Sequence, residues 1–380
     1  MNIDDLLRLM VNKKASGLHL RAGKCPVLRI GGELIFEEDL PEITEGDTKQ
    51  LFEAISSEEQ RRAFEQELGL DFAYAAQGIG RFRVNAYLQG GTLSLVFLLI
   101  RTEIPTIEGF GLPAICKTLA LKPNGLVVIT GPTGSGKSTT LAAMMEYLNQ
   151  NAKKKIITIE DPVEFVFQDK KCMFSQRELG RDARSFAVAV KQALRQNPDV
   201  IMVGEMRDLE TIAATITAAE TGHLVLATLH TPGAPQAVDR IIDVFPAYQQ
   251  QQVRTQLSVT LEGVLYQNLV PMIGGSGRVV AMEVMMANVA IKRLIREGKT
   301  HQMLNAIQTG AEFGMQTLDQ ALFDLAQKKI ISKGEAIARS RDPEEMERML
   351  LGGGSPRNAS PQIKGKGSLT DAGKATPNNS

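Results

Sequence analysis

The pattern of hydrophobic and polar positions divides the chain into a first part of mixed character and a second part where strands and helices alternate. In the first 100 residues, a Ser57-to-Gln60 capping box predicts a helix start, and runs at 70–75 and 81–88 alternate as two strands joined by a turn. Near the start, apolar residues recur at helical spacing at Ile3, Leu6, Leu7, Met10 and Val11. Residues 1–100 are therefore expected to form a small α+β domain.

Residues 101–115 contain two prolines and two glycines and are expected to be a linker. Beyond residue 120 the pattern alternates between strand and helix, which is typical of a parallel sheet covered by helices on both faces. The strands are expected at 126–129, 156–159, 200–203 and 224–229, and helices at 185–196 and 209–221. This α/β core is assigned to residues 116–285.

The chain is expected to be helical over residues 286–351, where apolar positions repeat at helical spacing. Residues 352–380 are dominated by Gly, Ser, Pro, Asn and Lys and contain no aromatic residue, so a disordered tail is expected. No signal peptide is expected. The longest apolar run, residues 93–100, is much shorter than the ~20 residues of a spanning helix, so a soluble, cytoplasmic protein is expected.

The composition argues against two classes of protein, those with a large nucleic-acid surface and those with a zinc ribbon. With 43 Lys+Arg and 43 Asp+Glu the net charge is zero, which argues against a large non-specific nucleic-acid surface. The three cysteines, Cys25, Cys116 and Cys172, are far apart and form no CxxC pair, which excludes a ribbon-type zinc site and favours reduced, buried thiols. A length of 380 residues favours two domains plus a tail.

The strongest chemical signal is a complete phosphate-binding loop between the strand at 126–129 and a helix-compatible segment. Its glycines let the backbone N–H groups turn toward phosphates, Lys137 can reach the β- and γ-phosphates, and Ser138 can ligate Mg²⁺. We therefore expect Mg²⁺ and a nucleoside triphosphate, ATP or GTP, as cofactors. The expected nucleotide-binding residues of this loop are Gly131, Pro132, Thr133, Gly134, Ser135, Gly136, Lys137, Ser138 and Thr139.

Acidic and imidazole groups follow the other predicted strands, and the carboxyl ends of parallel strands share one edge of a sheet. We expect Glu164 to be the catalytic base and Glu205 to serve catalysis and the Mg²⁺ shell with Ser138. Glu160 and Asp161 are candidate nucleotide-binding residues, with capping of the turn before Pro162 as the alternative. His223 precedes the strand at 224–229, and His230 follows it. Either histidine could sense the γ-phosphate or be structural.

The strand at 81–88 places Arg81 and Arg83 on one face and apolar residues on the other. Two arginines on a solvent-facing strand could protect a sheet edge against aggregation. They could also act in trans as arginine fingers on the nucleotide of a neighbouring subunit. The strand pattern alone favours the first interpretation.

Three segments together resemble the Asp box, Walker B motif and His box of secretion-superfamily ATPases: residues 160–165, 197–208 and 221–231. Within that superfamily the chain is most similar to the retraction ATPases of type IV pili. Supporting segments are residues 15–23, 80–85, 239–246, 290–299 and 314–317. The resemblance covers roughly residues 1–350.

The resemblance implies a PAS-like N-terminal domain, a RecA-like P-loop NTPase domain, and a homohexameric ring with nucleotide at subunit interfaces. It makes Arg81 and Arg83 expected trans-acting arginines and strengthens the assignments of Glu164, Glu205 and His230. It further implies that ATP hydrolysis drives pilin disassembly in twitching motility. The expected partners are an inner-membrane platform protein and the pilus base, which would recruit the ring to the cytoplasmic face of the membrane.

The chain departs from the family pattern at Gly17, where Asp is usual, and at Leu98, where a third arginine is expected. Arg101 is a nearby candidate substitute, and Lys292-Arg293 replaces an Arg-Asn pair in the C-terminal motif. These changes put the turnover rate and the strength of retraction in doubt.

Three alternatives remain open from the sequence. A pilus-extension or type II secretion ATPase usually carries a longer N-terminal region and a four-cysteine insert, and this chain has neither. A RecA-like nucleic-acid translocase would need stacking and phosphate contacts, for which a neutral chain with no tryptophan is poorly equipped. A non-hydrolysing regulatory protein is the third.

Overall fold

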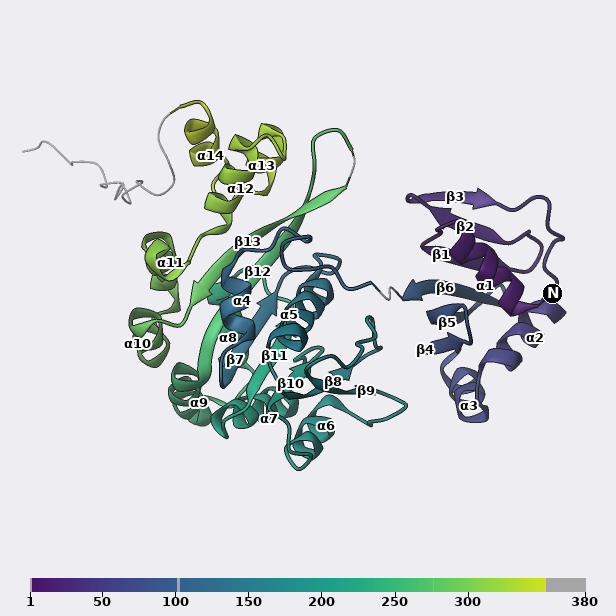
Figure 1. Ribbon diagram of the computed structural model, residues 1–380, viewed down its shortest axis with the longest axis horizontal. Helices are drawn as coiled ribbons and strands as arrows, with labels where there is room; N and C mark the ends of the chain where they lie inside the picture. Colours follow the sequence, from purple (N-terminus) through teal and green to yellow (C-terminus); the bar gives the residue numbers. More distant parts are fainter. Residues whose placement is uncertain (1, 101–102, 276, 353–380) are drawn as a thin grey trace, which may run out of the picture.

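The structure, a computed structural model, describes residues 2–100, 103–275 and 277–352. Figure 1 shows an N-terminal sheet with its helices, a larger second sheet with helices on both sides, and a group of helices at the C-terminal end. The α/β fold class expected from the sequence is confirmed. The disordered tail expected at 352–380 lies, apart from Gly352, outside the described residues.

The N-terminal part is a six-stranded antiparallel sheet in the order β3-β2-β1-β6-β5-β4, with helices packed against it. Helix α3 begins at the capping box expected from the sequence, because Ser57 Oγ accepts from Gln60 N at 3.2 Å and Gln60 Oε1 accepts from Ser57 N at 2.8 Å. The elements are α1 (Ile3–Asn12), β1 (Gly17–Arg21), β2 (Val27–Ile30), β3 (Glu33–Phe36), α2 (Glu45–Ile55), α3 (Glu58–Glu67), β4 (Gly69–Ala76), β5 (Gly80–Gln89) and β6 (Thr92–Ile100).

Strand β5 has the alternation that its sequence predicts. Phe82, Val84 and Ala86 are fully buried, and Arg81 and Arg83 lie on the opposite face. The strand is not at an edge, however, since β4 and β6 pair with its two sides. The interpretation of the two arginines as protection of a sheet edge is therefore wrong.

The second sheet has seven strands in the order β13-β12-β7-β11-β10-β8-β9. All neighbours pair in parallel except β12 and β13, which form an antiparallel pair at one edge. The strands are β7 (Gly125–Thr130), β8 (Lys155–Glu160), β9 (Met173–Glu178), β10 (Val200–Val203), β11 (Leu224–Leu229), β12 (Leu261–Pro271) and β13 (Arg278–Met286). The four strands expected from the sequence are β7, β8, β10 and β11.

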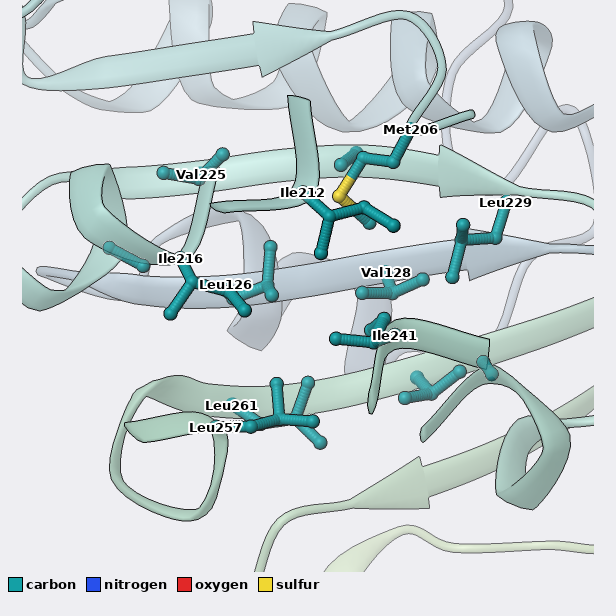
Figure 2. Close-up of a cluster of buried hydrophobic side chains, with 14 of the residues drawn as sticks. Leu126, Val128, Met206, Ile212, Ile216, Val225, Leu229, Ile241, Leu257 and Leu261 are labelled. Atoms are coloured by element: carbon teal, nitrogen blue, oxygen red, sulfur yellow. The ribbon is translucent and has the colours of Figure 1, made fainter. Parts of the chain in front are cut away.

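Helices cover both faces of this sheet, which explains why every residue of β7 and β11 is buried. One face packs against α6 to α9, and Figure 2 shows part of that core, where Leu126 and Val128 of β7 and Val225 of β11 meet Ile212 and Ile241 from the helices. The other face packs against α4 and α5. These helices are α4 (Ile115–Ala120), α5 (Lys137–Asn151), α6 (Phe186–Ala193), α7 (Leu209–Glu220), α8 (Ala234–Asp243) and α9 (Ala247–Thr260).

The segment expected to be a linker contributes to this core in its second half. Ile107 and Leu112 are buried in the cluster that lies between the sheet and α5. Phe110 approaches the phosphate-binding loop so closely that a Cβ added at Gly136 would lie 3.0 Å from Phe110 Cζ. Residues 107–112 are thus part of the packed second body.

The C-terminal region is helical, as expected. Its last three helices pack against β12 and β13 through a cluster that includes Leu322, Ile331 and Met346. The helices are α10 (Val289–Glu297), α11 (Met303–Thr309), α12 (Leu318–Gln327), α13 (Lys333–Arg339) and α14 (Pro343–Leu350), with single 3₁₀ turns at Thr300–Gln302 and Ala311–Phe313. Among the helices that the structure describes, none is both long and apolar enough to cross a bilayer.

Candidate nucleotide site

The carboxyl ends of the central strands meet at one edge of the second sheet. In the β7–β11 register Thr130 lies opposite Leu229, and in the β10 register Val203 lies opposite Ile159 and Ala227. The segments after these strands therefore share one edge, as the sequence predicts. They line a cavity of about 1450 Å³ together with residues of the N-terminal sheet.

Most of the predicted site residues line this cavity. Arg81, Gly131, Pro132, Ser135 and His223 are not in its lining. The predicted residues that are in it are Arg83, Thr133, Gly134, Gly136, Lys137, Ser138, Thr139, Glu160, Asp161, Glu164, Glu205 and His230.

The phosphate-binding loop runs from Gly131 to Gly136, and α5 begins at Lys137. The loop is fixed from β12, because Gln267 Nε2 donates to Ser135 O at 2.7 Å. At Gly131, with φ +148°, an added Cβ would lie 2.4 Å from Gln267 O, whereas at Gly134, with φ +77°, it would meet nothing within 4 Å. The N-terminus of α5 thus opens toward the cavity with the loop held in place behind it.

Lys137 is only 8% exposed and donates to the carbonyl oxygens of Gly131 and Pro132, both at 3.0 Å. Burial lowers the pKa of Lys137, against the opposing pull of the Glu205 and Glu164 carboxylates. Loop carbonyls are weaker partners for an ammonium than phosphate oxygens are. The lysine is therefore positioned to exchange these contacts for a bound triphosphate.

His230 stands between Lys137 and Glu205. Its Nδ1 is 3.5 Å from Lys137 Nζ, and its Nε2 is 3.3 Å from Glu205 Oε1. An ammonium can only donate, so Nδ1 faces it as an acceptor, and the ring proton belongs on Nε2, where it can be donated to the carboxylate. His230 therefore connects the phosphate-binding lysine to the acid after β10.

Glu205 also accepts from Arg207 at 2.7 Å. Burial alone would raise the pKa of Glu205, but the contacts with Arg207 and His230 bring it below its usual value, so the carboxylate stays charged. Arg207 lines the cavity as well. Arg207 belongs to the Walker B segment, but the sequence did not assign it to the site. Its position two residues after Glu205 could have indicated that role.

Glu164 accepts from Ser138 Oγ at 2.8 Å, so the predicted base and the predicted Mg²⁺ ligand are direct neighbours. The loop that carries Glu164 is fastened by Gln176 of β9, whose Nε2 donates to Phe165 O at 2.8 Å and to Glu160 Oε1 at 3.1 Å. Gln176 is a site-supporting residue that the sequence did not indicate.

Glu160 lies beneath this loop and is largely buried, although it forms part of the cavity lining. It accepts from Thr158 Oγ1 at 2.6 Å and from the backbone N–H of Glu164 at 3.4 Å, and burial raises its pKa. The bond from the Glu164 N–H spans the turn that contains Pro162, which agrees with the turn-capping interpretation of Glu160. A contact of Glu160 with nucleotide stays a prediction. Asp161 remains in the cavity lining.

His223 lies at the opposite edge of the sheet from His230, because it precedes β11. Its Nδ1 is 3.0 Å from Ala218 O and its carbonyl accepts from Gly125 N at 3.0 Å, at the start of β7. The expectation that His223 contacts the nucleotide is therefore wrong for the site within this chain. Its position before the strand could have shown this.

Arg81 and Arg83 project from the N-terminal sheet toward the site of the same chain. Arg81 donates to Glu178 at 2.7 Å, and Glu178, which is nearly fully buried, also accepts from Val163 N at 3.3 Å. Arg83 lines the cavity, with its Nε 3.6 Å from Asp71 Oδ1. This arrangement within one chain differs from the trans arrangement expected from the sequence.

Two departures from the family pattern face each other in the N-terminal sheet. Gly17 of β1 and Leu98 of β6 are cross-strand partners, and Leu98 is 42% exposed in the cavity lining beside Arg83. An acid and an arginine in this pair would be close enough to interact across the strands. Arg101, the suggested substitute, lies outside the described residues.

The comparison with known families agrees with this geometry. Residues 112–335 match the family model described as type II/IV secretion system protein. This chain belongs to that family. The crystal structure of the pilus retraction motor PilT with bound ADP is similar to this chain. The similarity covers 92% of this chain and 100% of that structure, with 44% sequence identity and a TM-score of 0.86.

Two curated relatives from Pseudomonas aeruginosa are similar over nearly their whole lengths. The type IV pilus retraction ATPase PilT is 47% identical over 344 residues, which cover 90% of this chain and 99% of the relative. The type IV pilus ATPase PilU is 43% identical over 92% of this chain and 91% of the relative. The predicted family and its ATPase class are therefore confirmed.

Proposed function

We propose that the protein is an ATP-driven motor of type IV pilus retraction, built as a homohexameric ring. The observation that carries this proposal is the convergence of Lys137, Glu164, Glu205 and His230 on one cavity in a chain of which 90% matches 99% of PilT. Similarity to PilU supports the same class of pilus ATPase, so an accessory role beside another retraction motor is the second candidate.

The residues present fit a bound Mg²⁺, since the Ser138 hydroxyl and the Glu164 and Glu205 carboxylates are the hard oxygen donors that this ion prefers. Ser138 and Glu205 would hold it, directly or through water. When bound, Mg²⁺ neutralises phosphate charge and orients the terminal phosphates.

The chain's own groups divide the remaining work of hydrolysis. Lys137 and the N-terminus of α5 bind the phosphates, and Glu164 orients the attacking water and takes its proton. His230 transmits the state of the phosphate-binding lysine to Glu205 through its two ring nitrogens. Arg83, from the N-terminal sheet, supplies positive charge to the same cavity and so makes hydrolysis sensitive to domain position.

In the cell the ring is proposed to act on the cytoplasmic face of the inner membrane, recruited by a pilus platform protein at the pilus base. This assignment rests on the relatives rather than on a surface of the chain. The ring would couple hydrolysis to movement of the N-terminal sheet over the site, and no nucleic-acid partner is expected for a chain of zero net charge.

The decisive experiment combines turnover with a phenotype. Purified protein is expected to release phosphate from ATP with Mg²⁺, and Lys137→Ala is expected to reduce the rate at least 100-fold, because the phosphate-binding charge is lost. Deletion of the gene should yield hyperpiliated cells that do not twitch, and the Lys137→Ala gene should fail to restore motility. Cells without pili would instead indicate an extension motor, and normal turnover in the variant would contradict the proposed site.

A further inference from the structure

Glu283 is a fully buried carboxylate that lies outside the nucleotide cavity. It sits on β13, and its Oε1 accepts from the backbone N–H of Ala234 at 2.8 Å and from the Arg341 guanidinium at 2.9 Å. Its second oxygen, Oε2, is buried without a hydrogen-bond partner in the described residues. Burial raises the pKa of Glu283, and the Arg341 guanidinium is the strongest of the groups that oppose this shift. The charged form of the carboxylate therefore depends on Arg341.

The backbone N–H that Glu283 binds belongs to the segment that follows His230. Ala234 is the first residue of α8, only four positions after His230. Between them, Thr231 N donates to Thr130 Oγ1 at 2.8 Å, at the end of the strand that leads into the phosphate-binding loop. The His230 loop, residues 230–234, is thus fixed by β7 at one end and by Glu283 at the other.

Arg341 belongs to the C-terminal helical region, between α13 and α14. Its backbone N–H donates to Asp319 Oδ1 on α12 at 2.9 Å, which ties it to that region. Its guanidinium packs closely against the His230 loop. A Cβ added at Gly233 would lie only 2.5 Å from Arg341 Nη2. The arginine therefore contacts both the buried acid and the loop that the acid holds.

We propose that Arg341 and Glu283 are positioning residues for ATP hydrolysis, through which the C-terminal helical region holds the His230 loop in its working position. The inference rests on the proposed ATPase function and adds a dependence on a region that does not line the nucleotide cavity. When α12 to α14 shift away from β13, Glu283 loses its cation, and the N-terminus of α8 and the adjacent histidine lose their anchor.

The first test uses Arg341→Met, which keeps an apolar stem and removes the charge. We expect kcat to fall about 10-fold or more, while the dissociation constant of a fluorescent ATP analogue changes less than threefold, because Lys137 and the phosphate-binding loop are untouched. Arg341→Lys is expected to restore part of the turnover. The matched control is Arg339→Met, which removes the Arg339–Glu335 pair on α13 and should leave kcat unchanged.

The substitution Glu283→Gln tests whether the loss of turnover in Arg341→Met comes from the unpaired carboxylate at the His230 loop. In Arg341→Met the buried carboxylate is left without its cation, so adding Glu283→Gln should recover part of the lost turnover. Additive losses in the double variant would overturn the inference, as would unchanged kcat in Arg341→Met at temperatures well below its melting transition.

A spectroscopic measurement keeps the inference testable apart from turnover. The chain has four histidines, so NMR of protein labelled at histidine Cε1 can follow His230 after assignment with His230→Asn. Arg341→Met should shift the His230 signal and leave the His19 signal in place, and Arg339→Met should shift neither. Absence of hydrolysis by the unaltered protein would refute the proposed function, whereas an unmoved His230 signal in Arg341→Met would refute this inference alone.

Discussion

At the scale of single residues, Lys137, His230 and Glu205 form a series of contacts in which each hydrogen-bond partner restricts the donor and acceptor roles of the next. Lys137 requires an acceptor at His230 Nδ1, and this leaves the ring proton on Nε2, directed at Glu205. His230 is thus placed to connect the lysine ammonium and the Glu205 carboxylate through its two ring nitrogens.

Glu164 offers a clear separation between binding and catalysis. Glu164→Gln keeps an oxygen that can accept from Ser138 but removes the proton acceptor, so kcat should fall about 10²–10⁴-fold. Binding of a fluorescent ATP analogue should change little, since Lys137 is intact. Phosphate release and analogue titration measure the two quantities.

The control for this variant is Glu210→Gln, an exposed carboxylate in the first turn of α7, which should behave like the unaltered protein. Turnover in Glu164→Gln within twofold of that control would remove Glu164 from the role of base.

Much of the site could be predicted residue by residue, because its members follow strands with strong apolar signals. Lys137, Glu164, Glu205 and His230 come after β7, β8, β10 and β11, and the sheet brings them together. The supporting contacts could not be predicted in the same way. Gln176 acts through a side-chain amide on a strand with no apolar signal, and such contacts depend on tertiary packing.

At the scale of elements, the sequence predicted the four central strands and missed the strands that flank them. Strand β12 carries the buried Gln267 and β13 the buried Glu283, and these polar residues interrupt the apolar pattern. The apolar run of β6 is too short for a membrane span, and its length and composition also fit a buried strand. Strands β12 and β13 were missed because their polar residues acquire partners only in the folded chain.

The cross-strand pair of Gly17 and Leu98 gives a prediction at this scale. Replacing both, as Gly17→Asp with Leu98→Arg, should place a paired arginine in the cavity beside Arg83 and raise kcat severalfold or more, since an additional cation can stabilise transition-state charge. Steady-state phosphate release would measure the gain.

Two single variants serve as controls for this double variant. Gly17→Asp alone should not increase kcat, and Leu98→Gln should show the effect of polarity without charge. A double variant that is no faster than the unaltered protein would mean that the site operates without a third arginine.

At the scale of the whole molecule, Arg81 and Glu178 connect the N-terminal sheet to the segment that carries Glu164, the proposed catalytic base. Glu178 accepts from Arg81 and from Val163 N, one residue before Glu164. A rotation of the N-terminal sheet that pulls on Arg81 therefore acts close to Glu164. Hydrolysis and domain movement would be coupled through this short path.

Mixing of subunits tests whether the arginines serve their own chain. Because Arg83 lines the cavity of its own chain, rings mixed from Lys137→Ala and Arg83→Ala subunits should hydrolyse ATP no faster than the weighted mean of the two pure variants. Arg83→Ala is expected to lose at least 10-fold in kcat. The rate is measured across mixing ratios.

Mixed rings of unaltered and Lys137→Ala subunits provide the control for assembly. A clear maximum at intermediate ratios of Lys137→Ala and Arg83→Ala would show that Arg83 acts on the neighbouring subunit, as first expected from the sequence.

The first glycine of the phosphate-binding loop has a consequence for how mutant data should be interpreted. A side chain at Gly131 would collide with the backbone of β12 before any nucleotide is present, so an inactive Gly131 variant reports damaged assembly of the sheet, not weakened affinity. Gly134 faces open space, and a small substitution there strains only the backbone. Of the two positions, only Gly134 would allow a loss of ATP affinity to be attributed to the ligand contact itself.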